Sequence, residues 1–169
     1  MSSLLPPLPP SWPFARESRP TIAPLAPAHA PACATIHASG FARGWSPTDI
    51  ESLIADRGVV GDGLFLAGDQ KRPRGFVLSR AVLDEAEILT IALEPAIRGR
   101  GFSRVLLERH LEALRREGVA RLHLEVDEAN VPARALYARL GFAQVGRREG
   151  YYQRADGSRA SALTLSLDL

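Results

Sequence analysis

One stretch, residues 90–107, constrains the fold most, because it joins a buried strand to a helix through a short basic turn. The apolar run ends near Leu93, and helical periodicity begins at about Phe102. A strand that leads into a helix in this way leaves the first backbone N–H groups of the helix without helical partners. These N–H groups and the helix dipole together favour an anion.

The residues of the turn favour the same kind of ligand. Gly99 and Gly101 carry no side chain that would keep a phosphate away from the backbone. Arg98, Arg100 and Arg104 add guanidinium donors for charge-assisted hydrogen bonds. The pattern is neither the dinucleotide-binding G-x-G-x-x-G nor the Walker G-x-x-x-x-G-K-[ST], and glycine turns before helices are common. Taken alone, it fits a structural turn as well as a pyrophosphate-binding loop.

The rest of the chain predicts an α/β fold. Apolar or alternating runs bounded by turn residues predict strands over 21–25, 63–67, 74–82, 87–93, 121–126, 142–147 and 162–167. Helical spacing predicts helices over 28–39, 47–55 and 102–117 and a short one between Asn130 and Gly141, with Ser46 and Asn130 as N-caps. The order β-α-α-β-β-β-α-β-α-β-β predicts a mixed sheet with helices on both faces.

Composition sets the class of protein. The 169 residues are 46% hydrophobic and 24% charged, which is typical of a globular chain. We expect the proline-rich residues 1–18 to form a flexible tail and residues 19–169 to form one domain. A formal net charge of only +2 argues against nucleic-acid binding. No apolar run is long enough to span a membrane, and we expect a cytoplasmic protein.

The cysteine and the histidines are expected to be structural. The single Cys33 falls in an alanine-rich helix, where it is expected to be a small buried apolar residue. His37, His110 and His123 have no metal-ligand spacing with one another or with Cys33, so no metal site is expected.

Several ordered motifs resemble the GCN5-related N-acetyltransferase (GNAT) superfamily. Arg98, Gly101 and Ser103 occupy the key places of that family's R/Q-x-x-G-x-G/A acetyl-CoA loop, with Ser103 where glycine or alanine is usual. Residues 124–142 (LEVDEANVPARALYARLGF) and 146–152 (GRREGYY) resemble the ribosomal-protein alanine N-acetyltransferases within the family. Further matches are Val82–Ala86 and the spacing of His37, Phe41 and Trp45. The resemblance runs from about residue 22 to the C-terminus.

The resemblance implies the GNAT fold, a mixed and mostly antiparallel sheet of six to seven strands, and acetyl-CoA as cosubstrate without a metal. The strand before the loop would bind the pantetheine arm through backbone groups, which a splayed sheet at this point would leave available. Asn130 resembles a CoA-contacting asparagine, but helix capping explains it equally well. The implied acetyl-CoA contacts are Ile91, Ala92, Leu93, Arg98, Gly99, Arg100, Gly101, Phe102, Ser103, Arg104 and Asn130.

The same resemblance assigns the catalytic groups. Glu125, near the end of a predicted central strand, is the candidate general base, and Tyr137, at the family's spacing from it, is the candidate acid. Each residue has a structural alternative. Glu125 fits a surface salt bridge with Arg121 or Arg147, and Tyr137 fits an amphipathic core tyrosine.

The acceptor side is assigned by resemblance to aromatic and basic residues from two parts of the chain. Phe41 and Trp45 fit either a wall of the acceptor site or a plug of the core. The C-terminal contributors are Arg147, Arg148, Tyr151 and Tyr152.

The implied reaction is direct acetyl transfer in a ternary complex from acetyl-CoA to the N-terminal α-amine of a protein. The implied acceptor is the N-terminal alanine of the eighteenth small-subunit ribosomal protein. Two other functions fit the same residues: acetylation of a lysine side chain or a small amine, and CoA binding without catalysis. The sequence leaves the oligomeric state open.

Overall fold

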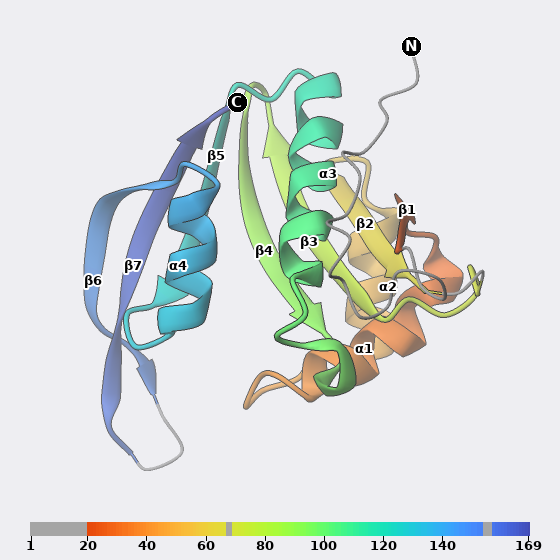
Figure 1. The fold of residues 1–169 in the computed structure, drawn as a ribbon, viewed down its shortest axis with the longest axis horizontal. Coiled ribbons are helices and arrows are strands. Elements are labelled where there is room, and N and C mark those ends of the chain that lie inside the picture. Colours follow the sequence, from red (N-terminus) through yellow and green to blue (C-terminus); the bar gives the residue numbers. More distant parts are fainter. Residues whose placement is uncertain (1–19, 67–68, 154–156) are drawn as a thin grey trace.

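Seven strands form one mixed sheet in the order β1-β2-β3-β4-β5-β7-β6 (Figure 1). The computed structural model describes residues 20–66, 69–153 and 157–169, so the predicted tail over 1–18 lies outside the described residues. Every neighbouring pair of strands is antiparallel except β4 and β5, which are parallel. The mixed, mostly antiparallel sheet predicted from the sequence is confirmed. The strands are β1 (Thr21–Pro24), β2 (Val59–Phe65), β3 (Gly75–Val82), β4 (Glu85–Leu93), β5 (Arg121–Asp127), β6 (Ala143–Gln153) and β7 (Arg159–Asp168).

Helices cover both faces of the sheet, each over its own buried cluster. One cluster lies beneath α1 and α2 and contains Cys33, whose thiol pKa burial raises to about 12, as expected of an inert core cysteine. The other lies beneath α3 and α4, which both appear in front of the sheet in Figure 1. In the part of the chain that the structure describes, none of the helices is long and apolar enough to cross a membrane. The helices are α1 (Ala30–Ala38), α2 (Pro47–Ala55), α3 (Phe102–Arg116) and α4 (Val131–Arg139), and the 3₁₀ turns are η1 (Pro27–His29) and η2 (Pro95–Ile97).

Local residues fix where the helices begin and end. The Ser46 hydroxyl accepts a hydrogen bond from the Asp49 N–H at 3.1 Å, and the Asn130 side chain accepts one from the Ala133 N–H at 3.2 Å. Both residues are therefore the N-caps that the sequence predicted. Gly118 follows α3 with φ of +85° and Gly141 follows α4 with φ of +94°, and both angles favour glycine.

The parallel strands β4 and β5 separate along their length. They pair only between residues 85–87 of β4 and residues 121–123 of β5, although β4 continues to Leu93 and β5 to Asp127. Figure 1 shows the two strands diverging into a V. The second half of β4 therefore has a partner on its β3 side, while its other edge faces the opening. This is the splayed sheet that the sequence analysis anticipated.

The start of β2 was predicted wrongly. The strand begins at Val59 and not at Gly63, because Gly61 and Gly63 lie inside it and pair with β3. A side-chain carbon on Gly61 would lie 2.8 Å from Leu78 Cδ2, and one on Gly63 would lie 2.8 Å from Leu25 Cδ2. Close packing therefore explains why glycine occupies these two positions of the strand. From the local sequence alone, the same glycines suggest a turn. β6 and β7 also extend further toward each other than predicted.

A buried polar network joins α3 to the sheet. His110, with no exposed surface, contacts Asp62 of β2 through Nδ1 at 2.6 Å and Ser79 of β3 through Nε2 at 2.7 Å. The three side chains are of the kinds found in hydrolytic triads, but all three are buried, so a substrate cannot reach the serine. The network is structural, as expected for His110, and it satisfies polar groups that would otherwise be costly to bury.

Candidate active site

The basic turn forms the connection between β4 and α3 at the wide end of the V. Gly99 has φ of +72° and Gly101 has φ of +80°, a left-handed conformation that other residues adopt only with strain. A side-chain carbon on Gly99 would meet no atom within 4 Å, so the backbone there borders open space. Gly101 is the N-cap of α3 and provides no side-chain oxygen to the first helical turn. The loop therefore has the geometry in which backbone donors can accept an anionic ligand.

The arginines of this loop differ in what they contact. Arg98 donates through Nε to the Leu93 carbonyl and through Nη2 to the Ser39 hydroxyl, both at 2.9 Å. Arg104 pairs with Glu108 at 2.7 Å, and Arg100 is exposed. Arg98 thus connects the end of β4 to the end of α1. That the guanidinium groups of Arg98, Arg100 and Arg104 bind phosphate stays a prediction.

The strand that precedes the loop lies along the opening of the sheet. Ala92 pairs with Phe76 of β3, and Leu93 pairs with Gly75. Their other edge, and that of Ile91, faces the space between β4 and β5. The structure therefore places the predicted pantetheine-binding segment where an extended amide-containing arm could add hydrogen bonds to the sheet.

Glu125 lies on β5, across this opening. Its side chain is 19% exposed, and its Oε1 lies 3.2 Å from Nε of Arg148. The predicted alternative partners, Arg121 and Arg147, are engaged elsewhere, Arg121 with Asp168 at 2.8 Å. The ion-pair partner of Glu125 is therefore Arg148, and the prediction of Arg121 or Arg147 was wrong. The error is one of strand register, because Arg147 and Arg148 point to opposite faces of β6.

Tyr137 and Asn130 lie on the segment that follows β5. Tyr137 is buried in the cluster beneath α4, with its ring edge-to-face against Phe142 at a centroid distance of 5.5 Å. Asn130 caps α4, so its structural alternative is correct. The further roles assigned to these residues by resemblance, proton donation by Tyr137 and a CoA contact by Asn130, stay predictions.

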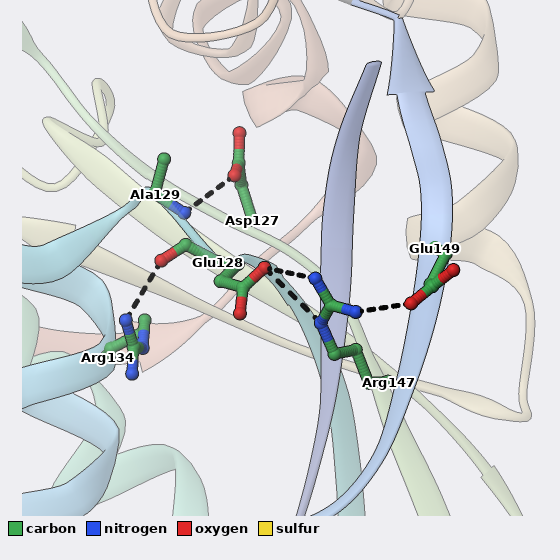
Figure 2. A network of polar contacts seen from close by, with 6 residues as sticks. All are labelled: Asp127, Glu128, Ala129, Arg134, Arg147 and Glu149. Atoms are coloured by element: carbon green, nitrogen blue, oxygen red, sulfur yellow. Dashed lines mark hydrogen bonds and ion pairs between the residues drawn. The ribbon is translucent and has the colours of Figure 1, made fainter.

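Arg147 holds together the turn after β5 and strand β6 (Figure 2). Its guanidinium contacts Glu128 Oε2 through Nη2 at 3.0 Å and Glu149 Oε1 through Nη1 at 2.7 Å. Glu128, and less strongly Glu149, raises the pKa of Arg147 above its ordinary value. Arg134 of α4 donates to the Glu128 carbonyl at 3.0 Å, which extends the same network to α4. An acceptor could therefore bind the Arg147 guanidinium only in competition with the carboxylates of Glu128 and Glu149.

The remaining C-terminal residues lie on the outer half of β6. Tyr151 is half exposed, and the Arg148 guanidinium lies 5.2 Å from the centre of its ring, within the range of a cation–π contact. Tyr152 belongs to β6, but its side chain lies outside the described residues.

His37 organises the predicted acceptor wall, a role that the sequence analysis missed. Its ring stacks on Phe41 at a centroid distance of 4.2 Å and on Trp45 at 4.6 Å. Its Nδ1 also accepts a hydrogen bond from the Trp45 N–H at 3.2 Å. Phe41 is 44% exposed, whereas Trp45 packs against the cluster beneath α1 and α2. Trp45 is therefore a plug of the core, and an acceptor-site wall formed by these aromatic residues stays a prediction.

The burial of His37 makes the stability of the folded chain sensitive to pH. Burial lowers the pKa of His37 below 6.5, so the folded chain binds the proton less readily than the unfolded chain does. His37 thus contributes stability that is complete above about pH 6.5 and is lost as the pH falls through the lower pKa of the folded state. We predict that the unfolding free energy in urea falls between pH 7.5 and pH 5.5, and that the fall is smaller in His37→Phe. An equal fall in both proteins would contradict this assignment.

Comparisons with known proteins agree with this arrangement. The family model described as "Acetyltransferase (GNAT) family" matches residues 30–142. The chain belongs to the GNAT family. The acetyl-CoA loop that the sequence predicted lies within the matched residues, and the predicted resemblance and fold are confirmed. Among the described residues, no three His, Cys, Asp or Glu side chains gather as they would around a metal ion.

Relatives within the GNAT family carry one recurring name, [Ribosomal protein bS18]-alanine N-acetyltransferase. The protein of that name from Escherichia coli strain K12 is 34% identical over 149 residues, which cover 88% of this chain and 97% of that protein. The Haemophilus influenzae protein is 40% identical over 54% of this chain, and the Haemophilus ducreyi protein is 36% identical over 56%. These two matches span less than two thirds of the relatives, 62% and 65% of their lengths.

Solved GNAT structures have the same fold. The crystal structure of the ribosomal-protein-S18-alanine N-acetyltransferase from Escherichia coli has a TM-score of 0.80 at 33% identity, covering 89% of this chain and 94% of that chain. Arabidopsis thaliana NAA60 in complex with acetyl-CoA has a TM-score of 0.78 at 19% identity, covering 89% and 99%. The second likeness concerns the fold alone.

Proposed function

We propose that this GNAT protein transfers an acetyl group from acetyl-CoA to the N-terminal α-amine of a protein, and that its acceptor is the N-terminal alanine of ribosomal protein bS18. The observation that carries the proposal is the 34% identity to the Escherichia coli bS18-alanine N-acetyltransferase over 97% of that protein. The family match over residues 30–142 includes β4 and β5, which border the opening where both substrates would meet.

Acetyl-CoA would bind along β4 and at the start of α3. The backbone N–H groups of residues 99–104 and the dipole of α3 would hold the diphosphate. The free edge of β4 at residues 91–93 would pair with the amide groups of the pantetheine arm. This placement aims the thioester into the opening, with Glu125 on its far side.

Glu125 and Tyr137 would move the protons of the reaction. Glu125 accepts a proton from the acceptor ammonium, directly or through water, and leaves a neutral amine. The neutral amine nitrogen attacks the thioester carbon and forms the N–C bond, and the C–S bond then breaks. Tyr137 donates its hydroxyl proton to the departing thiolate, and the second proton of the attacking nitrogen passes, through water, to the Tyr137 phenolate and restores its hydroxyl. The products are an amide and CoA with a free thiol.

An α-amine suits a single carboxylate base better than lysine does. The α-amine has a pKa of about 7.7–8.0, whereas the lysine side chain has a pKa of about 10.4. Near pH 7.4, roughly a quarter of an α-amine is already neutral, compared with about one lysine in a thousand. Glu125 therefore has to deprotonate an ammonium group whose pKa is already close to the pH of the solution, which a single carboxylate can do.

Steady-state assays with three acceptors test the proposal. The acceptors are a peptide with the first six residues of bS18, the same peptide with a blocked N-terminus and an added lysine, and spermidine. We expect acetyl-CoA to be consumed rapidly only with the first peptide, and mass spectrometry to place the acetyl group on its α-amine. Faster turnover with the blocked peptide or with spermidine would favour a lysine or small-amine acetyltransferase instead.

Replacing Tyr137 with phenylalanine tests the proposed acid. The ring would keep its packing against Phe142, so the fold and CoA binding should be retained. We expect kcat to fall about tenfold, less than for a typical acid catalyst, because a thiolate with a pKa of about 8.5 leaves without complete protonation. Calorimetric titration with CoA provides the control. An unchanged kcat would leave Tyr137 with its structural role alone.

A further inference from the structure

The carboxylate of the proposed base already has a cationic partner. Arg148 reaches Glu125 from β6, across the intervening strand β7. Ala162 of β7 pairs with Arg148 on one side and with Asp127 on the other. Its small side chain lies on the same face as both arginine and glutamate, and this leaves a path for the long arginine side chain over β7.

This ion pair is the kind that is easily replaced. The Arg148 side chain is 59% exposed, and its closest approach to Glu125 is the single 3.2 Å contact from Nε. Exposed pairs of this kind typically change an equilibrium by a factor of about five or less. The neighbouring Arg147 differs, because two carboxylates, those of Glu128 and Glu149, hold its guanidinium. Arg148 also lies over the exposed ring of Tyr151, which provides a second contact for the guanidinium.

We propose that Arg148 is a displaceable counter-ion of Glu125, whose place the ammonium group of the acceptor takes. The proposal rests on the proposed function, because it takes Glu125 as the group that meets the acceptor. An ammonium group is, like guanidinium, a cationic hydrogen-bond donor, and it can form the same contact with the carboxylate. Arg148 is therefore a positioning residue that competes with the acceptor ammonium for the carboxylate of Glu125.

The test compares Arg148→Gln with the unmodified protein in acetyl transfer to a hexapeptide that begins with alanine. We expect KM for the peptide to fall about two- to fivefold, because the competitor is gone, while KM for acetyl-CoA is unchanged. The difference in peptide KM between Arg148→Gln and the unmodified protein should shrink as the pH rises above about 8, where the neutral amine predominates. Restoring the cation in Arg148→Lys should raise KM again.

Arg121→Gln is the matched control, because Arg121 lies on the same face of β5 as Glu125 and forms an exposed pair with Asp168. It should leave both KM values unchanged. Calorimetric titration of the CoA complexes with the peptide gives the same comparison without turnover. Spermidine is titrated in parallel, because the competition applies to any acceptor ammonium.

A higher or unchanged peptide KM in Arg148→Gln, together with unchanged binding of both amines, would overturn the inference. This result differs from failure of the proposed function, in which the unmodified protein acetylates no α-amine at all. If spermidine alone binds, tighter binding to Arg148→Gln would still support the counter-ion, and equal binding would refute it.

Discussion

Replacing Glu125 with glutamine is expected to lower kcat for an α-amine acceptor by about 50- to 100-fold at pH 6, where only about 1–2% of the α-amine is neutral, and by about fourfold at pH 7.4. Glutamine keeps the shape of the side chain but cannot accept a proton from the ammonium group. The loss should diminish toward pH 9, because most of the α-amine is then neutral before it binds. The measurement is the pH profile of kcat for the peptide that begins with alanine, in both proteins.

Glu85→Gln is the matched control for this substitution. Glu85 is an exposed carboxylate at the narrow end of the opening, where β4 and β5 still pair, and its Oε2 lies 3.9 Å from Nε2 of His123. We expect its kcat to equal that of the unmodified protein. A Glu125→Gln protein that retains full kcat at every pH would remove Glu125 from the chemistry and leave it as a salt-bridge residue.

Replacing His110 with leucine is expected to lower the free energy of unfolding by about 3 kcal/mol, the upper end of the range when a buried polar group loses its hydrogen-bond partner. Asp62 would then keep a carboxylate with little access to water and without its 2.6 Å contact. Urea unfolding followed by circular dichroism measures the change.

A variant that replaces all three network residues separates the cost of unpaired groups from the cost of altered packing. Asp62→Val, Ser79→Ala and His110→Leu together leave no polar side chain behind in the network. We expect this triple variant to recover most of the lost stability, because apolar replacement of an entire buried pair is often neutral. A triple variant as unstable as His110→Leu would show that the cavity and not the carboxylate determines the loss.

Most elements of the fold follow from local sequence. Ser46 and Gly118 mark the limits of α2 and α3 because capping depends on a few adjacent residues. The start of β2 was missed because Gly61 and Gly63 are required by the close packing of Leu78 and Leu25. These leucines are distant from the two glycines in the sequence. Local patterns contain no such information.

The candidate site shows the same division. The left-handed conformation of Gly99 and Gly101 follows from the glycine motif, because backbone conformation depends on adjacent residues. The catalytic role of Glu125 stays a prediction from resemblance. The contacts of Arg98 with Ser39 and of Arg148 with Glu125 were not found, because long side chains reach across elements that only the tertiary fold brings together. His37 was recognised as structural, but its position between two aromatic rings requires the folded loop.

A crystal structure of the protein with CoA and an alanine-starting peptide tests the central claim most directly. We predict that the diphosphate lies against the backbone N–H groups of residues 99–104 and that the sulfur lies between β4 and β5, with Glu125 and Tyr137 beside it. The peptide amine should replace Arg148 at Glu125. A diphosphate bound elsewhere, or a sulfur distant from both side chains, would contradict the proposed mechanism.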